Sequence, residues 1–195
     1  MSKTKKEISD ILSQGPRIDL SKSFSGASGV ALILSGSGPQ LELLFIKRAL
    51  NPSDRWSGQI AFPGGKRHEE DASLLAACLR EVHEEIGVEL TTAQLLGSLD
   101  DIQARKRDLL LEFYIEPFVF HMAEKPAMQL SPREVDKVYW IPVEYLIDPA
   151  NATTFEIMHE GVTVKLPAVY FPDGEVLWGL SYMMLQNFFV KMGWH

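Results

Sequence analysis

The feature that most constrains the fold is a change in hydrophobic period after residue 72. Through residues 73–86 apolar side chains recur at intervals of four, three and four, which places them in one stripe on an α-helix. Gly87 follows where helices commonly end. Upstream, residues 59–62 form a short strand-like run that Pro63 and two glycines stop. The sequence therefore predicts a strand, a tight loop and an amphipathic helix in succession. The stripe consists of Leu75, Leu79, Val82 and Ile86.

Three glutamates share one turn of this predicted helix. Glu81, Glu84 and Glu85 fall within an arc of roughly 100° that is offset from the apolar stripe. Like charges at this spacing repel by about 0.2–0.5 kcal/mol per pair, so we expect a compensating cation, and a divalent metal is the obvious candidate. Mg²⁺ prefers hard oxygen ligands such as carboxylates. The alternative interpretation is an ordinary solvated acidic face.

The rest of the chain mixes strands and helices without a regular alternation, which favours an α+β fold with a mixed sheet over a doubly wound one. Residues 30–34 and 41–47 are expected to form a hairpin, because a Ser/Gly-rich turn separates them. Other expected strands are 95–99, 110–120, 135–141, 162–166 and 169–171, with Pro167 and Pro172 as interruptions; a helical turn is expected at 144–147 and a last apolar helix at 180–192.

Length and composition fit one domain. A chain of 195 residues, 46% of them hydrophobic, can bury a full core. We expect an N-terminal appendage over residues 1–26 and a single domain over residues 27–195. Whether the appendage packs on the domain, exchanges with a partner or stays mobile is open at this point. The apolar C-terminal helix could equally serve the core or a homodimer interface through Met183, Met184, Phe188 and Phe189.

Charge and cysteine content exclude several classes of function. A formal charge of −7 disfavours a protein that grips long nucleic acid by charge alone. The single cysteine, Cys78, excludes an internal disulfide framework and is expected in the core. The basic N-terminus is not followed by the apolar core of a secretory signal, and no apolar run reaches membrane-spanning length. We therefore expect a cytoplasmic protein with neither nucleic acid nor membrane as a partner.

The segment from Gly64 to Val88 resembles the signature of the Nudix hydrolases. That signature is a glycine, five residues, an acid, seven residues, then Arg-Glu-apolar-X-Glu-Glu-X-Gly-apolar, and the run Arg80 to Val88 matches its end. Two departures are Asp71 in place of the first glutamate and a spacer of eight residues to Arg80. The resemblance implies a Nudix-type α/β/α sandwich with a mixed β-sheet. It also implies metal-dependent hydrolysis of a nucleoside diphosphate linked to another moiety.

The same resemblance implies the roles of individual residues. Glu81, Glu84 and Glu85 would bind Mg²⁺ or Mn²⁺ together with the backbone carbonyl of Gly64. Arg80 would orient a neighbouring glutamate. The general base of the family lies in the signature helix or on a later loop, where Glu134 is the candidate here; it is as easily an exposed loop glutamate. Asp71 has two open interpretations, a catalytic acid or an ordinary acid near a helix N-terminus.

Upstream residues resemble the extra motif of the coenzyme A pyrophosphatase branch. The apolar run before Arg48 and the run Gly58 to Gly65, which contains Phe-Pro-Gly-Gly, carry this likeness; Arg55 stands closer to Gly58 than the pattern asks. The likeness implies hydrolysis of coenzyme A or its derivatives to 3′,5′-ADP and 4′-phosphopantetheine. The alternatives are ADP-ribose, dinucleotides or nucleotide sugars as substrates, and a non-catalytic nucleotide-sensing module. The residues expected to contact substrate phosphates are Arg48, Arg55, Lys66 and Arg67.

Overall fold

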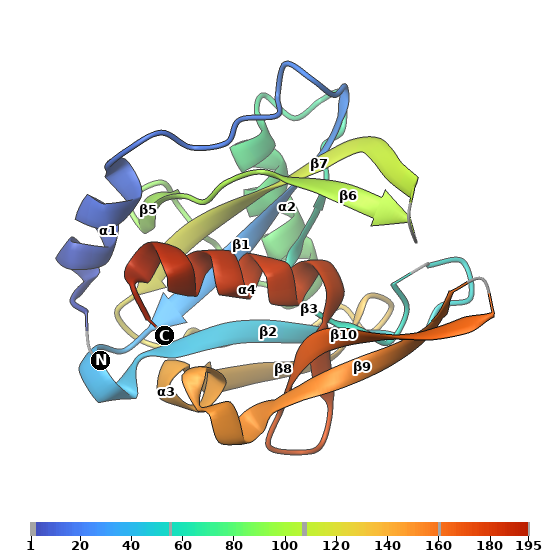
Figure 1. Cartoon of the computed structure of the whole chain (residues 1–195). Helices are drawn as coiled ribbons and strands as arrows, with labels where there is room; N and C mark the ends of the chain where they lie inside the picture. The colour runs from blue at the N-terminus through green and yellow to red at the C-terminus, as the bar shows by residue number, and fades with distance from the viewer. Residues whose placement is uncertain (1–2, 55, 107–108, 160, 195) are drawn as a thin grey trace.

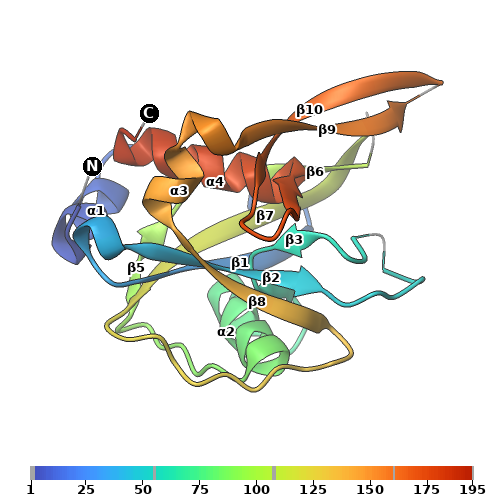
Figure 2. The same cartoon turned by 90° about the horizontal axis from the view of Figure 1, so that it is seen from below.

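The computed structural model describes the chain except for residues 1–2, 55, 107–108, 160 and 195. A mixed sheet of eight strands forms its centre. Helix α2 (Leu74–Ile86) covers one face of this sheet, and α4 (Gly179–Met192) lies on the other, together with a smaller three-stranded sheet (Figures 1 and 2). This α+β sandwich confirms the predicted fold class.

The central strand β1 (Gly26–Ser35) organises the large sheet. It pairs antiparallel with β2 (Glu42–Arg48) and parallel with β7 (Leu109–Met122), so the predicted hairpin and the mixed sheet are both confirmed. The strand order is β3-β2-β1-β7-β5, with β4 on β1, β6 on β7 and β8 on β2. The remaining bounds are β3 Ile60–Ala61, β4 Gly64–Lys66, β5 Leu95–Ser98, β6 Ile102–Lys106 and β8 Val135–Pro142.

The prediction was wrong about where the first strand begins. Gly26 and Gly29 appeared to belong to a linker, but they are part of β1. Gly29 lies where α2 packs on the strand, and a Cβ atom there would stand 2.6 Å from the Leu74 carbonyl oxygen. Glycine at this position therefore permits close packing of helix on strand.

The smaller sheet has the order β11-β10-β9. Its strands are β9 (Ala152–His159), β10 (Val162–Tyr170) and β11 (Val176–Trp178). The sequence analysis missed β9 and divided β10 at Pro167, which the structure corrects. Pairing of β10 with β11 starts only at Ala168, so at Pro167 the strand has a partner on the β9 side alone. A proline is tolerated there because one side of the strand needs no donor.

The N-terminal segment packs on the domain. Helix α1 (Lys5–Ser13) begins with a capping box between Thr4 and Glu7, and its Ile8 side chain is fully buried. It lies beside β5 and α4 (Figure 1). Of the three possibilities left open for this segment, the structure shows packing on the domain, and α1 contributes to the main core.

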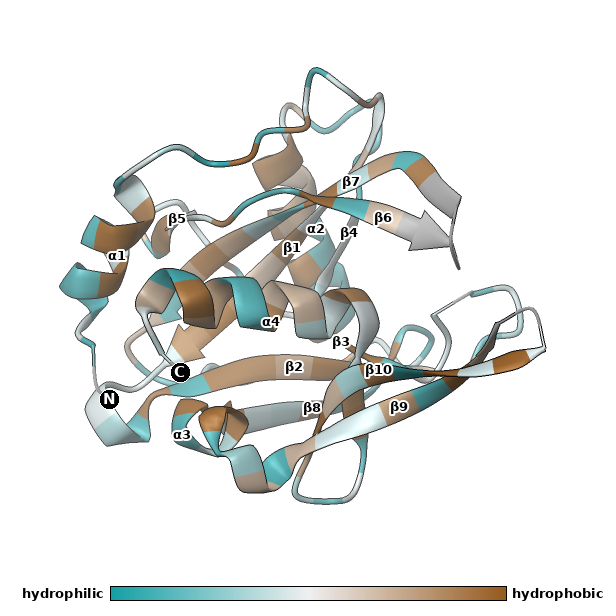
Figure 3. Ribbon diagram, in the orientation of Figure 1, coloured by the Kyte–Doolittle hydropathy of each residue, from teal (hydrophilic) through white to brown (hydrophobic). Residues whose placement is uncertain are grey.

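Side-chain alternation along β1 divides the core in two. Val30, Leu32 and Leu34 belong to the cluster shared with α1 and α4, whereas Ala31 and Ile33 belong to the cluster under α2. Apolar residues concentrate along the central strands between the helices (Figure 3). Within the described ranges, no helix is long and apolar enough to cross a membrane.

The two short helical elements and α4 complete the fold. Helix α3 (Val143–Ile147) follows β8, and 3₁₀ turns occur at Gly38–Gln40 and Pro149–Asn151. The predicted last helix is confirmed as α4. Of its four residues considered for a homodimer interface, Met183 is 44% exposed, and the other three are core residues: Met184, Phe188 and Phe189.

Candidate active site

Helix α2 has both of its ends fixed by local chemistry. The Ser73 side chain accepts a hydrogen bond from the Ala76 amide at 3.1 Å and caps the N-terminus. Gly87 ends the helix in the left-handed conformation with φ 70°, which glycine adopts without strain. The helix is therefore regular in spite of the eight-residue spacer before Arg80.

The buried face of α2 differs from the predicted stripe. Leu75 and Leu79 are only partly buried, and the buried arc turns toward the acidic side. Glu85 consequently lies within the buried face, with 2% of its surface exposed. The expectation that the helix separates an apolar side from an acidic side was thus wrong for this glutamate. The buried residues are Leu74, Ala77, Cys78, Val82, Glu85 and Ile86.

Glu85 is a buried carboxylate with few partners. The Gly64 amide donates a hydrogen bond to its Oε2 at 2.8 Å. Among the described residues Arg48 is the one cation paired with it, and its Nη1 atom stays 3.6 Å from Oε1. Burial raises the pKa of Glu85 to about 8, although the Gly64 hydrogen bond and the Arg48 charge oppose that shift. A negative charge at this position would be stabilised by a further cation.

The two glycines that the sequence placed in a tight loop belong to strand β4, where they allow close approach of Glu81. A Cβ atom at Gly65 would lie 2.4 Å from the Glu81 carboxylate carbon. Gly64 has φ 135°, and a Cβ atom there would lie 2.4 Å from the Gly29 carbonyl oxygen of β1. Larger residues would separate β4 from both neighbours. Glu81 and Glu85 therefore lie against consecutive residues of one short strand.

Arg80 is the hub of an ion-pair network on the exposed side. Its Nη1 atom donates to Glu81 at 2.8 Å and to Glu84 at 3.4 Å. Its Nε and Nη2 atoms donate to the two oxygens of Asp71 at 3.0 and 2.9 Å, and Nη2 also reaches the Lys66 carbonyl at 3.2 Å. Arg80 thus contacts the glutamate that it was expected to orient.

The contacts of Asp71 favour a structural role. Its bidentate pair with Arg80, followed by the His68 amide hydrogen bond, lowers the pKa of Asp71 to about 2. The residue lies before the Ser73 cap, outside the helix itself. Asp71 therefore fastens the loop to Arg80, which explains why an aspartate suffices at this position.

Glu134 is brought to the same end of α2. The loop before β8 is fixed to the helix terminus, since the Ser131 amide donates to the Glu85 carbonyl at 2.9 Å. The Ala49 amide donates to the Glu134 carbonyl at 2.8 Å. The Glu134 carboxylate is exposed, and its charge contributes to the raised pKa of Glu85. The candidate base and Glu85 are therefore electrostatic neighbours.

The predicted substrate contacts have different surroundings. Arg48 is not free, because its Nε donates to Asp54 at 2.7 Å. Lys66 and Arg67 are exposed, and the Arg67 guanidinium reaches the Asp71 carbonyl at 3.3 Å. Arg55 lies outside the described residues. Sequence reasoning gave Asp54 no role, because nothing in the pattern indicates that a loop acid six positions later returns to Arg48.

The carboxylates are not gathered into a closed metal cage. In the part of the chain that the structure describes, no three His, Cys, Asp or Glu side chains are grouped as a ready ligand set. Arg80 holds Glu81 and Glu84, while Glu85 is turned toward Gly64. The donors nevertheless fit a hard divalent cation, since two carboxylates lie against the glycines of β4 and the charge of the buried one is only partly compensated.

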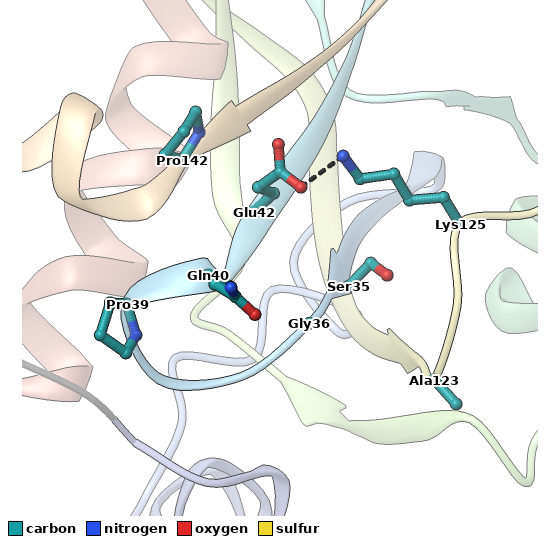
Figure 4. A pocket seen from close by; sticks show the side chains of 8 residues that line it. All are labelled: Ser35, Gly36, Pro39, Gln40, Glu42, Ala123, Lys125 and Pro142. Carbon is teal, nitrogen blue, oxygen red and sulfur yellow. Dashed lines mark ion pairs between the residues drawn. The ribbon is translucent and has the colours of Figure 1, made fainter.

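A separate hollow lies at the far end of β1. Glu42 and Lys125 form an ion pair across it (Figure 4). Its walls come from the β1–β2 turn and the chain after β7, whereas β4 joins β1 at Ser28–Val30 near the opposite end. The hollow is therefore not part of the α2 site. It is lined by Ser35, Gly36, Pro39, Gln40, Glu42, Ala123, Lys125 and Pro142.

Comparison with known proteins places this geometry in a family. The model of the NUDIX domain matches residues 26–160. A protein of Schizosaccharomyces pombe, described as uncharacterized protein C14C4.10c, is 34% identical over 121 residues. That match covers 59% of this chain and 36% of the yeast protein. The Nudix hydrolase NudL of Yersinia pestis, itself described as uncharacterized, is 24% identical over 149 residues, which are 76% of this chain and 71% of NudL.

Solved structures show the same fold. A MutT/nudix family protein from Enterococcus faecalis superposes with a TM-score of 0.60 at 18% identity, over 99% of this chain and 76% of that one. The NUDIX domain of Shewanella oneidensis NrtR, solved in complex with ADP ribose, gives a TM-score of 0.50 at 22% identity, over 74% and 87%. The Nudix fold predicted from the signature is confirmed. Because the domain model matches well over half of the sequence, this chain belongs to the NUDIX family of hydrolases.

Proposed function

We propose that this chain hydrolyses the diphosphate of a nucleoside diphosphate linked to another moiety, with a divalent metal ion bound at α2. Nudix hydrolases generally use divalent metal ions. The observation that carries the proposal is the buried carboxylate of Glu85, whose charge is only partly compensated by a neighbouring cation. It lies next to Glu81, against the Gly64–Gly65 pair of β4. Such a position favours a bound cation over a purely structural role.

The metal ligands in this proposal are Glu81, Glu84, Glu85 and the Gly64 carbonyl. Mg²⁺ or Mn²⁺ bound there would polarise a phosphoryl oxygen and lower the pKa of an attacking water. The hydrogen bond from the Gly64 amide holds one oxygen of Glu85, and Arg80 holds one oxygen of Glu81. The ligand carboxylates are thus oriented by neighbours that are themselves fixed.

Glu134 is the proposed general base. Its carboxylate would take the proton of the attacking water, and its exposed position lets the product proton leave to solvent. The backbone of its loop is held by Ala49 on one side and by the end of α2 on the other. These contacts fix the backbone from which the carboxylate projects.

Coenzyme A and its derivatives are the proposed substrates. Coenzyme A carries a 3′-phosphate beside its diphosphate, and cationic side chains from β2, from β4 and from the residue after β4 lie at the end of the large sheet where Arg48 approaches Glu85 of α2. Arginine suits phosphate because its guanidinium donates two parallel hydrogen bonds. The upstream resemblance to the coenzyme A pyrophosphatase branch supports this choice. The cations are Arg48, Lys66 and Arg67, with Arg55 outside the described residues.

ADP-ribose is the second candidate substrate. The NUDIX domain of NrtR, which shares the fold, was solved with ADP ribose. ADP-ribose has the same diphosphate but lacks the 3′-phosphate. A preference for it would therefore leave the extra cations without a substrate phosphate to bind.

A panel of substrates tests the proposal. Coenzyme A, ADP-ribose, a dinucleotide and a nucleotide sugar are each incubated with Mg²⁺ or Mn²⁺, and the products are identified by mass. We expect 3′,5′-ADP and 4′-phosphopantetheine from coenzyme A, a loss of turnover of roughly a hundredfold or more with Glu85→Gln, and unchanged turnover with the exposed control Glu89→Gln. Fast turnover of ADP-ribose with little of coenzyme A would overturn the substrate, and binding without hydrolysis of any compound would overturn the enzymatic function.

A further inference from the structure

We propose that Asp54 is a positioning residue, which keeps Arg48 away from direct contact with Glu85 so that Glu85 is free to bind the metal. This inference rests on the proposed metal site. Asp54 belongs to the loop between β2 and β3 and is distant in sequence from the signature helix.

Both oxygens of the Asp54 carboxylate have a partner. Oδ1 accepts a hydrogen bond from the Trp56 amide at 3.0 Å, and Oδ2 accepts one from Arg48 Nε at 2.7 Å. The Asp54 side chain is 16% exposed. The loop backbone is closed around it, because the Asp54 amide donates to the Asn51 carbonyl at 3.0 Å and the Ser57 amide donates to the Asp54 carbonyl at 3.1 Å. The carboxylate is thus a fixed anchor for Arg48.

The strand aims Arg48 at the helix. Leu44 and Ile46 of β2 face the α2 cluster, and strand alternation places Arg48 on the same side. The β2–β8 register shifts between Lys47 and Arg48 because β8 carries one extra residue there, so the alternation of β2 itself continues to Arg48. Arg48 therefore ends beside Glu85 with its Nη1 atom 3.6 Å from Oε1, too far for a hydrogen bond.

Arg48 and a divalent cation compete for the same oxygen of Glu85. A guanidinium in direct contact with a buried carboxylate makes a short, strong, charge-assisted pair, and a metal would have to displace it. Asp54 holds the guanidinium by its Nε edge, and the Nη1 atom stays 3.6 Å from Glu85 Oε1, outside hydrogen-bond distance. Without the Asp54 charge, Arg48 would move the remaining distance onto Glu85.

The test compares metal binding in four variants. Asp54→Asn keeps an oxygen for the Trp56 amide but removes the charge that holds Arg48, so the loop turn is retained. Ser53→Ala is the matched control, because Ser53 bonds within the same loop to Asn51 and not to Arg48. Arg48→Gln and the double variant with Asp54→Asn remove the competitor. Mn²⁺ titration followed by electron paramagnetic resonance reports the dissociation constant without substrate.

We expect Asp54→Asn to bind Mn²⁺ roughly tenfold more weakly than the unmodified protein, the size typical of residues that act on a metal through its ligands. Ser53→Ala should bind it normally. In the double variant the affinity should return to that of Arg48→Gln, since no guanidinium remains to compete. The Mg²⁺ concentration for half-maximal turnover should rise in Asp54→Asn alone.

Two results would overturn the role of Asp54 and leave the hydrolase proposal intact. These are equal Mn²⁺ affinity in Asp54→Asn and the unmodified protein, or a loss that Arg48→Gln does not restore, which would show that Asp54 merely supports the loop. Absence of Mn²⁺ binding by the unmodified protein would overturn the metal site itself, and the Asp54 proposal with it.

Discussion

Two buried carboxylates in this protein have opposite surroundings. Asp101, between β5 and β6, and Glu85 of α2 are 5% and 2% exposed. Burial raises the pKa of both. Asp101 nevertheless has short bonds on both oxygens, from Arg17 Nη1 at 2.6 Å and from the Leu20 amide at 2.8 Å. Glu85 has one amide hydrogen bond, and among the described residues its one cation stays 3.6 Å away.

The difference shows that burial alone does not identify a functional carboxylate. Asp101 is paired with the segment after α1, and Arg17 extends the pair to Glu116 at 3.1 Å. Its charge is thus used to fasten the N-terminal segment to the sheet. Glu85 is buried to a similar extent with its charge only partly compensated, and the missing compensation is what favours a cation. Carboxylate-to-amide variants of the two residues test this contrast directly.

Glu85→Gln should give the largest effect. Removing the buried metal ligand should lower turnover by roughly a hundredfold to a thousandfold, comparable to the loss of one strong electrostatic contact in an active site. The fold should be kept, because the glutamine oxygen can still accept from the Gly64 amide. Turnover and the far-ultraviolet circular dichroism spectrum are the measurements; an active, metal-dependent Glu85→Gln enzyme would contradict the assignment.

Asp101→Asn should affect stability and spare activity. Removal of one partner of a buried ion pair leaves Arg17 poorly compensated, and we expect a loss of about 3 kcal/mol in the free energy of unfolding, at the low end for such pairs because Arg17 is partly exposed. Urea denaturation measures the loss, and turnover is followed below the transition. A stable but inactive Asp101→Asn protein would remove the distinction between the two carboxylates.

The pH dependence of the free energy of unfolding should reveal the raised pKa of Glu85 when the unmodified protein is compared with Glu85→Gln. Its pKa of about 8 in the folded state exceeds the ordinary value of 4.5, so the folded protein holds an extra proton between these values. The stabilisation that this group contributes is therefore fully present below pH 4.5 and is lost as the pH rises through about 8. In chelator, the free energy of unfolding of the unmodified protein should fall by about 2–2.5 kcal/mol relative to that of Glu85→Gln between pH 5 and pH 7. An equal change in the free energy of unfolding of both proteins between the two pH values, measured by urea denaturation, would contradict the raised pKa.

Gly65→Ala should give the smallest effect. The added methyl would press on the Glu81 carboxylate, the flexible end of a side chain, so the fold should tolerate it while the carboxylate shifts. We expect turnover to drop about tenfold, which is the smaller loss typical of changes beside a metal ligand. The unfolding midpoint should change little. Unchanged turnover in Gly65→Ala would show that the position of Glu81 against β4 is unimportant.

The local part of this account could be predicted from the sequence. The bounds of α2 and its glycine end follow from short-range patterns, and this helix carries the three predicted glutamate ligands. The β1–β2 hairpin is equally local. Such features depend on residues within a few positions of one another, so one sequence is sufficient to place them.

The remaining features depend on residues distant in sequence. Arg17 and Asp101 are 84 positions apart, and no spacing rule links them. The burial of Glu85 depends on how α2 is rotated against β1, where Gly29 permits close contact. Pro167 continues a strand because its neighbour β11 ends opposite Ala168. Tertiary packing decides each of these cases.

The most direct test of the central claim is Mn²⁺ binding to Glu85→Gln and Asp101→Asn, measured side by side by electron paramagnetic resonance. The two variants carry the same chemical change at two buried carboxylates. We predict that Glu85→Gln binds Mn²⁺ at least about tenfold more weakly than the unmodified protein, whereas Asp101→Asn binds it normally. Equal affinity in both variants would contradict the claim that the partly compensated carboxylate is the metal ligand.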